Sequence, residues 1–193
     1  QRQMCIRDST SATWPAYDVP YVVQGDIELR RASPVEPLPV MTIEPGVELR
    51  FAENRRLRVG DGNDGALDAR GTPSQPIVFT SIDVATPVFW RGLEFGQGSD
   101  GSILDKVVLA YGGGNSSIAN LSLRMGSAVS VGVAVFLQGA DYAAAVYPGS
   151  APMFVGPVTD RVYQLNGQDS IPGAGDPSFD CVRDISTGTC DPR

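Results

Sequence analysis

The sequence contains no histidine and a single lysine, Lys106, among its 193 residues. Histidine is the commonest general base near neutral pH and the commonest metal ligand, so its absence removes the usual routes to both chemistries. No run of 18 apolar residues occurs, and we therefore expect no transmembrane helix. The formal net charge is −7. This charge argues against nucleic acid or an anionic membrane as the main partner, because both bind basic surfaces.

Cysteine is also scarce, with three residues in the chain. Cys181 and Cys190 are nine positions apart around a Ser-Thr-Gly-Thr stretch. In an exported protein this spacing favours a disulfide that closes a small loop. Two unpaired thiols in a C-terminal tail are the alternative. A zinc site is disfavoured, because two cysteines without histidine do not supply four ligands.

The third cysteine, Cys5, belongs to an N-terminal segment that differs in character from the rest. Residues 3–9 can be read back into the codons CAG-ATG-TGT-ATA-AGA-GAC-AG, which resemble a transposon-end adapter used to prepare sequencing libraries. We therefore expect residues 1–9 to be an adapter remnant. The chain is then expected to be a metagenomic fragment of a longer bacterial protein, which leaves its export signal unknown.

What the chain does contain is turn-forming residues and a repeated phrase. The 22 glycines and 15 prolines are scattered, which predicts many turns, while 42% hydrophobic residues suffice for a packed core. An apolar–acid–apolar–Arg phrase occurs three times at a spacing of twenty: Ile27-Glu28-Leu29-Arg30, Val47-Glu48-Leu49-Arg50 and Leu67-Asp68-Ala69-Arg70. Its alternation is that of a β-strand. A second series lies midway, at residues 57–59 and 77–79, so each twenty-residue unit is predicted to hold two strands.

Strands that recur at constant spacing, without helical periodicity, predict a solenoid in which one repeat stacks on the next at roughly 4.8 Å. An antiparallel sandwich is the alternative, but it gives no reason for the constant spacing. The acids Glu28, Glu48 and Asp68 are then expected to form one outward column on a single sheet. The residues predicted to lie inside are Val47, Leu49, Leu67, Ile77, Phe79, Leu93, Phe95, Val107 and Leu109.

Four stretches carry a family resemblance: "MTIEPGVELRF", "GALDARGTPSQPIVFTS", "WRGLEFG" and "SILDKVVLAYGGG". In this order they resemble secreted right-handed parallel β-helix repeat proteins of bacteria, of pectate-lyase-like architecture and close to myxobacterial examples. The resemblance covers about residues 13–136. It implies an all-β, right-handed parallel β-helix over residues 10–155 and export to the cell surface or outside the cell. Residues 156–193 are expected to be irregular, or to form a last rung or cap.

The charged phrases admit two interpretations. Each acid and its arginine belong to a self-neutralising charge ladder that keeps the strands soluble, or they line a groove for a charged polysaccharide. We favour the ladder, because exposed charges are usually solvated surface. The residues concerned are Glu28, Arg30, Glu48, Arg50, Asp68 and Arg70.

A Gly-rich loop offers the one candidate for a metal. Asp61, Asn63 and Asp64 are hard oxygen ligands of the kind that bind calcium. Their spacing fits neither the twelve-residue helix–loop–helix pattern nor the nonapeptide calcium repeat. A polar turn is therefore the favoured interpretation, and no other cofactor is expected.

The resemblance does not imply one reaction, because this architecture carries pectin-degrading enzymes as well as adhesins. The acids Glu94, Asp100 and Asp105 are loosely clustered in sequence, but nothing makes them converge as a glycosidase pair would. We expect a non-catalytic extracellular or cell-surface module, structural or adhesin-like, that touches a polysaccharide or an envelope component. The alternative is a fragment of a polysaccharide lyase or glycoside hydrolase. A third interpretation is the structural N-terminal part of a larger exported protein.

Overall fold

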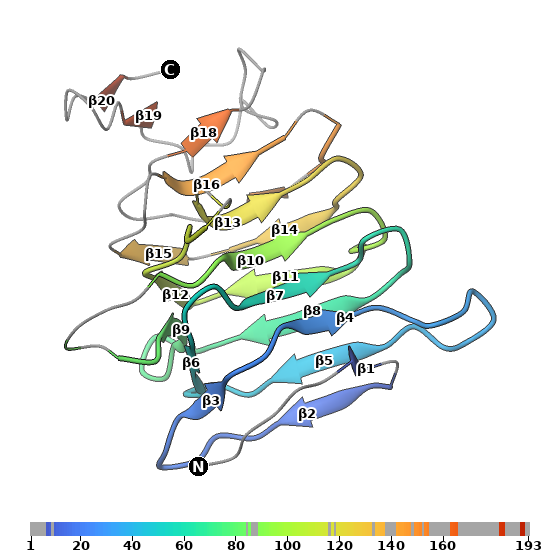
Figure 1. Cartoon of the computed structure of the whole chain (residues 1–193), viewed down its shortest axis with the longest axis horizontal. Coiled ribbons are helices and arrows are strands. Elements are labelled where there is room, and N and C mark those ends of the chain that lie inside the picture. The colour runs from blue at the N-terminus through green and yellow to red at the C-terminus, as the bar shows by residue number, and fades with distance from the viewer. Residues whose placement is uncertain are drawn as a thin grey trace.

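The chain forms an all-β solenoid of stacked parallel strands, in which the described residues contain no helix (Figure 1). The computed structural model describes residues 7–8, 10–83, 85, 89–115, 117, 119–132, 134–137, 142–147, 149–151, 153–154, 163–165, 182–183 and 190–191. The predicted fold class, a parallel β-solenoid, is confirmed. None of the described residues belongs to a helix long and apolar enough to cross a membrane.

Three parallel sheets form the sides of the solenoid, and we number them in the order in which the chain visits them. Sheet 1 contains β1 (Arg7–Asp8), β4 (Ile27–Leu29), β7 (Arg56–Val59), β10 (Gly92–Phe95), β13 (Ala119–Leu123), β16 (Tyr142–Val146) and β18 (Tyr163–Leu165). Sheet 2 contains β2 (Ala12–Trp14), β5 (Val40–Ile43), β8 (Ala66–Arg70), β11 (Ser102–Asp105), β14 (Val129–Val131) and β17 (Met153–Phe154). Sheet 3 contains β3 (Tyr21–Val23), β6 (Glu48–Phe51), β9 (Ile77–Ser81), β12 (Val107–Ala110) and β15 (Ala134–Leu137). A short antiparallel pair, β19 (Val182–Arg183) and β20 (Cys190–Asp191), forms a separate two-stranded sheet.

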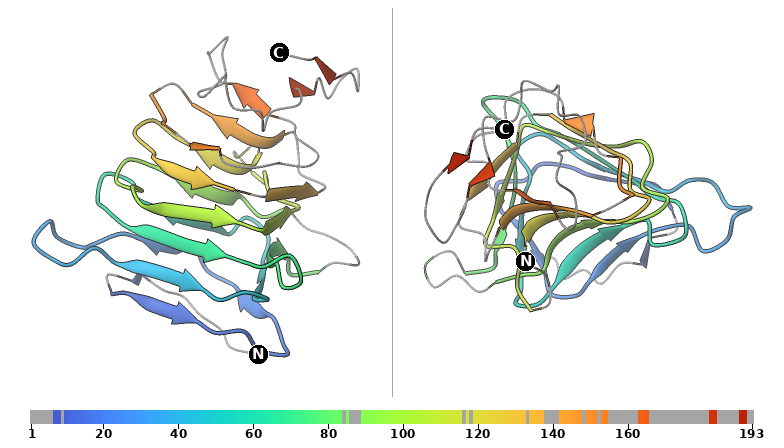
Figure 2. Two further views of the ribbon diagram at one scale, coloured as in Figure 1. Left: turned by 180° about the vertical axis from the view of Figure 1, so that it is seen from behind. Right: turned by 90° about the horizontal axis from the view of Figure 1, so that it is seen from above.

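One coil consists of three strands, so each strand from β1 to β14 pairs with the third strand after it. Ile27 in β4 lies opposite Leu57 in β7, and Leu49 in β6 lies opposite Phe79 in β9. Both pairs are thirty residues apart. Viewed from above, successive coils superimpose along three sides (Figure 2).

The prediction that Glu28, Glu48 and Asp68 share one column is therefore wrong. Glu28 lies in sheet 1, Glu48 in sheet 3 and Asp68 in sheet 2. A strand with its turn takes about ten residues here, so a spacing of twenty advances the chain by two sides of a three-sided coil. The apolar–acid–apolar–Arg phrase recurs because each side of the coil places two apolar side chains inward and two polar side chains outward. The strands nevertheless stack in parallel, so the solenoid is confirmed, although the common face expected for the three acids is not found.

The core is a column of apolar side chains between the three sheets. All nine residues predicted to lie inside are buried, each with 1% or less of its surface exposed. Trp90, which precedes β10, is also fully buried. Its ring stacks on Phe51 with a centroid distance of 4.2 Å, and its indole N–H donates a 2.7 Å hydrogen bond to the carbonyl of Ala110. The ring therefore fills the core without leaving its polar atom unpaired.

The corner between sheets 1 and 2 repeats one turn on four successive coils. Glycines with φ between 77° and 87° occupy the same place in each turn, namely Gly62, Gly98, Gly126 and Gly149. Each is followed by Asn or Ser. The Gly126 N–H donates to the Gly149 carbonyl at 2.9 Å, and the Ala128 N–H donates to the Ser99 hydroxyl at 3.4 Å. Only glycine adopts such a φ without strain, so the turns stack as regularly as the strands.

Strands occur in both terminal segments for which separate expectations were drawn from the sequence, residues 1–9 and residues 156–193. Within the segment expected to be an adapter remnant, Arg7–Asp8 forms β1, which pairs with β4; the origin of residues 1–9 stays a prediction. Beyond residue 155, β18 adds a further strand to sheet 1. The disulfide predicted between Cys181 and Cys190 lies outside the described residues and side chains, so it too stays a prediction.

Candidate functional site

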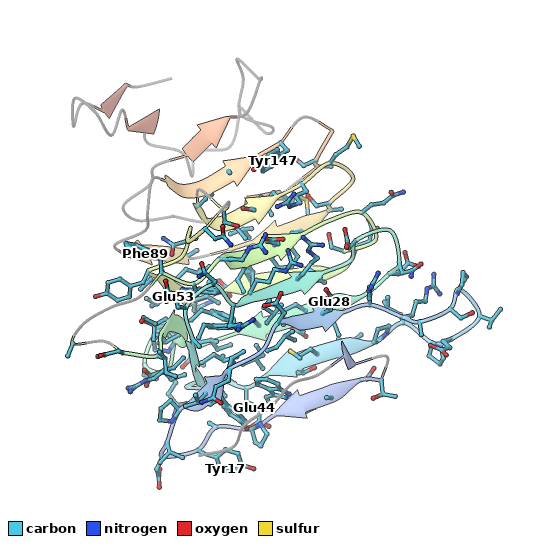
Figure 3. All side chains as sticks on the ribbon, in the orientation of Figure 1. Tyr17, Glu28, Glu44, Glu53, Phe89 and Tyr147 are labelled. Carbon is cyan, nitrogen blue, oxygen red and sulfur yellow. The ribbon has the colours of Figure 1, made fainter. Side chains whose placement is uncertain are left out.

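The outer face of sheet 1 carries the densest group of charged side chains that the structure describes. In the central outward column, Glu28 of β4 lies beside Arg58 of β7, and Arg58 lies beside Glu94 of β10. Opposite charges therefore alternate from coil to coil, whereas the sequence suggested a column of like charges. Figure 3 labels Glu28 on this side of the solenoid, with Tyr147 several coils further along.

Glu94 is the centre of this group and is fully buried, with 0% of its surface exposed. Its side chain points away from the apolar core, because the flanking Leu93 and Phe95 point inward. Four arginines surround its carboxylate: Arg56 at 3.3 Å, Arg58 at 2.9 Å, Arg91 at 3.5 Å and Arg124 at 3.6 Å. The Ser117 hydroxyl adds a hydrogen bond to Oε1 at 3.2 Å.

These arginines come from three consecutive coils. Arg56 and Arg58 belong to β7, Arg91 precedes β10, and Arg124 follows β13. One carboxylate thus links the coil below and the coil above to its own. Two of the arginines have a second acidic partner: Arg56 Nε lies 3.2 Å from Asp26, and Arg58 Nη1 lies 2.7 Å from Asp61.

The ionisation of Glu94 follows from these neighbours. Burial by itself raises the pKa of the Glu94 carboxyl, but the hydrogen bonds from Arg58 and the charges of Arg124, Arg58 and Arg56 outweigh it. The net pKa lies below the ordinary value of 4.5. Burial opposes the charge of Arg58 as well, yet its contacts with Glu94 and Asp61 raise its pKa. Both partners are therefore ionised at neutral pH.

The six residues of the charged phrases form three ion pairs, each between residues two apart in the sequence, and Glu28 also lies 3.9 Å from Arg56. Arg30 contacts Glu28 at 3.3 Å, Arg50 contacts Glu48 at 2.7 Å, and Arg70 contacts Asp68 at 2.9 Å. All six side chains are between 22% and 57% exposed. Because the pairs lie on three different sheets, no single surface collects them. Exposed pairs of this kind contribute about 0–1 kcal/mol each.

The calcium candidates lie in the corner turn between sheets 1 and 2, and both of their carboxylates face arginines. Asp61 pairs with Arg58 at 2.7 Å, and Asp64 forms an ion pair with Arg31. Over the part of the chain that the structure describes, no three His, Cys, Asp or Glu side chains are grouped as metal ligands. Calcium binding by Asp61, Asn63 and Asp64 stays a prediction.

The other acids considered for catalysis lie on different parts of the coil. Glu94 faces outward from sheet 1, Asp100 is exposed in the turn that follows, and Asp105 ends β11 in sheet 2. Asp105 forms an ion pair with Lys106.

Sequence reasoning considered Glu94 but missed Arg56, Arg58 and Arg124. The alternation in Arg56-Leu57-Arg58 placed both arginines on an outer face. Their partner was hidden because Glu94 lies 36 residues after Arg58, a longer interval than the thirty residues between Ile27 and Leu57. The long segment between β9 and β10 accounts for the difference. A register through such a segment is not visible in a fixed spacing.

Comparison with known proteins does not indicate a function, so the charged group around Glu94 is the main structural guide to it. No family model, no curated protein and no solved structure matches this chain.

Replacement of Glu94 tests the importance of the buried carboxylate. Glu94→Gln keeps the shape of the side chain but leaves four arginines without their shared anion. Breaking a buried pair costs about 3–5 kcal/mol, so we expect the free energy of unfolding in denaturant to fall by about that amount. The matched control is Glu48→Gln, which breaks an exposed pair and is expected to cost less than about 1 kcal/mol. Equal effects of the two variants would contradict the structural importance of Glu94.

The lowered pKa of Glu94 gives a pH dependence with a definite sign. Since the pKa of this carboxyl is lower in the folded than in the unfolded chain, its stabilisation is complete above about pH 4.5. It is lost as the pH falls through the folded-state pKa. Between about pH 6 and about pH 3, wild type should therefore lose more stability than Glu94→Gln, as measured by denaturant unfolding. Parallel losses in the two proteins would rule out this assignment.

Proposed function

We propose that this chain is a non-catalytic module of an extracellular or cell-surface protein, a rigid stalk or adhesin-like segment. The observation that carries the proposal is the burial of the Glu94 carboxylate among basic side chains. It is the one buried acidic residue among those described, and four arginines and a serine hold it. A general acid or base needs contact with its substrate and a pKa near the working pH. A fully buried carboxylate with a lowered pKa serves cohesion between coils instead.

Five other acids support the same function. Asp26, Asp61, Asp64, Asp68 and Asp105 each pair with a basic side chain. Each of these acids is thus neutralised by a basic side chain, rather than placed opposite a second carboxylate across a sugar-binding cleft. Acids that are paired in this way are typical of a solvated scaffold.

The location and partner belong to the proposal as well. The resemblance of the strand motifs to secreted bacterial β-helix proteins supports export. A long stack of parallel coils suits a spacer, because each coil is held by its neighbours on both sides. A polysaccharide or an envelope component is the partner we propose for such a module.

A degradation screen tests the proposal against a carbohydrate-active enzyme. The purified chain is incubated with neutral glycans and uronate polymers, with and without calcium. Release of reducing ends and of unsaturated products is then measured. We expect no product above that of the heat-denatured chain. Product formation that follows the folded chain through purification would overturn the non-catalytic assignment and favour the lyase or hydrolase alternative.

A further inference from the structure

Arg124 stands where the alternation of charges on sheet 1 ends. In the central outward column the residue beside Glu94 on the next coil is Ser122, which carries no charge. Arg124 follows the same strand, and its backbone N–H donates to the Phe95 carbonyl at 2.9 Å. The coil above thus supplies a cation without supplying a further acid to match it.

The guanidinium of Arg124 has little to bind within the described chain. Its nearest carboxylate oxygen is Glu94 Oε2 at 3.6 Å, beyond a good hydrogen bond. That oxygen already accepts hydrogen bonds from Arg58 at 2.9 and 3.0 Å and from Arg56 at 3.3 Å. No hydrogen bond from Arg124 to another described side chain is present, and its Nε is buried without a partner.

The local charge is also unbalanced. Arg56 and Arg58 each face a further acid, Asp26 and Asp61. Within the described residues, Arg124 faces only Glu94, which it shares with three other arginines. A positive charge is therefore left uncompensated at this point of a chain whose net charge is −7.

This cation is accessible and is held by an aromatic ring. The Arg124 side chain is 42% exposed, against 13–19% for the other three arginines. One coil further, the Tyr147 N–H donates to the Leu123 carbonyl at 2.9 Å, so Tyr147 occupies the position equivalent to Arg124. The Arg124 guanidinium carbon lies 5.8 Å from the Tyr147 ring centroid, within the range of a cation–π contact. Figure 3 labels Tyr147 at this end of the charged face.

We propose that Arg124, supported by Tyr147, is a binding site for a tetrahedral oxyanion, namely sulfate, phosphate or one of their monoesters. A guanidinium presents a planar fork of donors that matches two oxygens of such a group. The ring contact restrains the guanidinium, while 42% of the side chain as a whole is exposed. A phosphate carries up to two charges and three strong acceptor oxygens, so it attracts the guanidinium more strongly than a carboxylate with one charge does. The site lies apart from the three charged phrases and does not depend on catalysis.

Titration with inorganic phosphate and sulfate at low ionic strength tests the site. Binding is followed by calorimetry and by the shifts of the backbone amides of Arg124 and Tyr147, with acetate as the carboxylate comparison. Wild type should bind phosphate and sulfate saturably, and acetate more weakly. Arg124→Gln should raise the dissociation constant for phosphate and sulfate about tenfold, which is the loss of affinity expected when a charged hydrogen bond is removed. Arg124→Lys keeps the charge without the fork and should give an intermediate loss.

The matched control is Arg70→Gln, which removes another exposed arginine, one that is already paired with Asp68 on sheet 2. This variant should bind the anions as wild type does. Equal weakening by Arg70→Gln would show that the anions respond only to net charge. Unchanged affinity in Arg124→Gln, no saturable binding by wild type, or equal affinity for acetate would each overturn the proposal. Arg124→Lys guards against a folding defect, since its unfolding midpoint should match that of wild type.

Discussion

In-register stacking of parallel strands is the constraint on which the rest of this structure depends. A single coil has three short strands and cannot bury its apolar side chains alone, so each coil covers the next. Leu57, Leu93 and Leu121 therefore lie one above another on sheet 1 and are all fully buried. The backbone hydrogen bonds and the apolar column specify the same register. Because a shift by one residue would turn every inward side chain outward, this register is strongly determined.

The same register decides what happens outside the core. Outward neighbours on adjacent coils lie about 4.8 Å apart, so like charges in a column repel and opposite charges attract. The column Glu28, Arg58 and Glu94 satisfies this condition, and the additional arginines around Glu94 join three coils. Where Ser122 replaces a charge, the pairing ends and Arg124 retains an uncompensated charge. Cohesion and the proposed anion site thus arise from one ladder.

The sequence was informative where the structure depends on alternation and less so where it depends on the closing of a coil. Inward positions such as Leu49 and Phe79 were predicted, because their period of two is local. The length of the coil was not predicted, because a ten-residue unit of strand and turn has the same sequence pattern on all three sides. Arg58 and Glu94 meet across 36 residues, so their contact needed the register through a long segment. The scattered glycines predicted many turns, but the stacking of the corner glycines on four coils required the true coil length.

Crosslinking of introduced cysteines tests the three-strand coil most directly. Glu48 and Val78 are outward neighbours on sheet 3, thirty residues apart, whereas Glu48 and Asp68 would be neighbours only in a twenty-residue coil. A disulfide requires Cα atoms within about 7 Å. Oxidation followed by peptide mass spectrometry should therefore find a bond between the introduced residues in Glu48→Cys/Val78→Cys. The pair Glu48→Cys/Asp68→Cys should remain unlinked within one molecule. A bond in the second pair and none in the first would contradict the register on which the account depends.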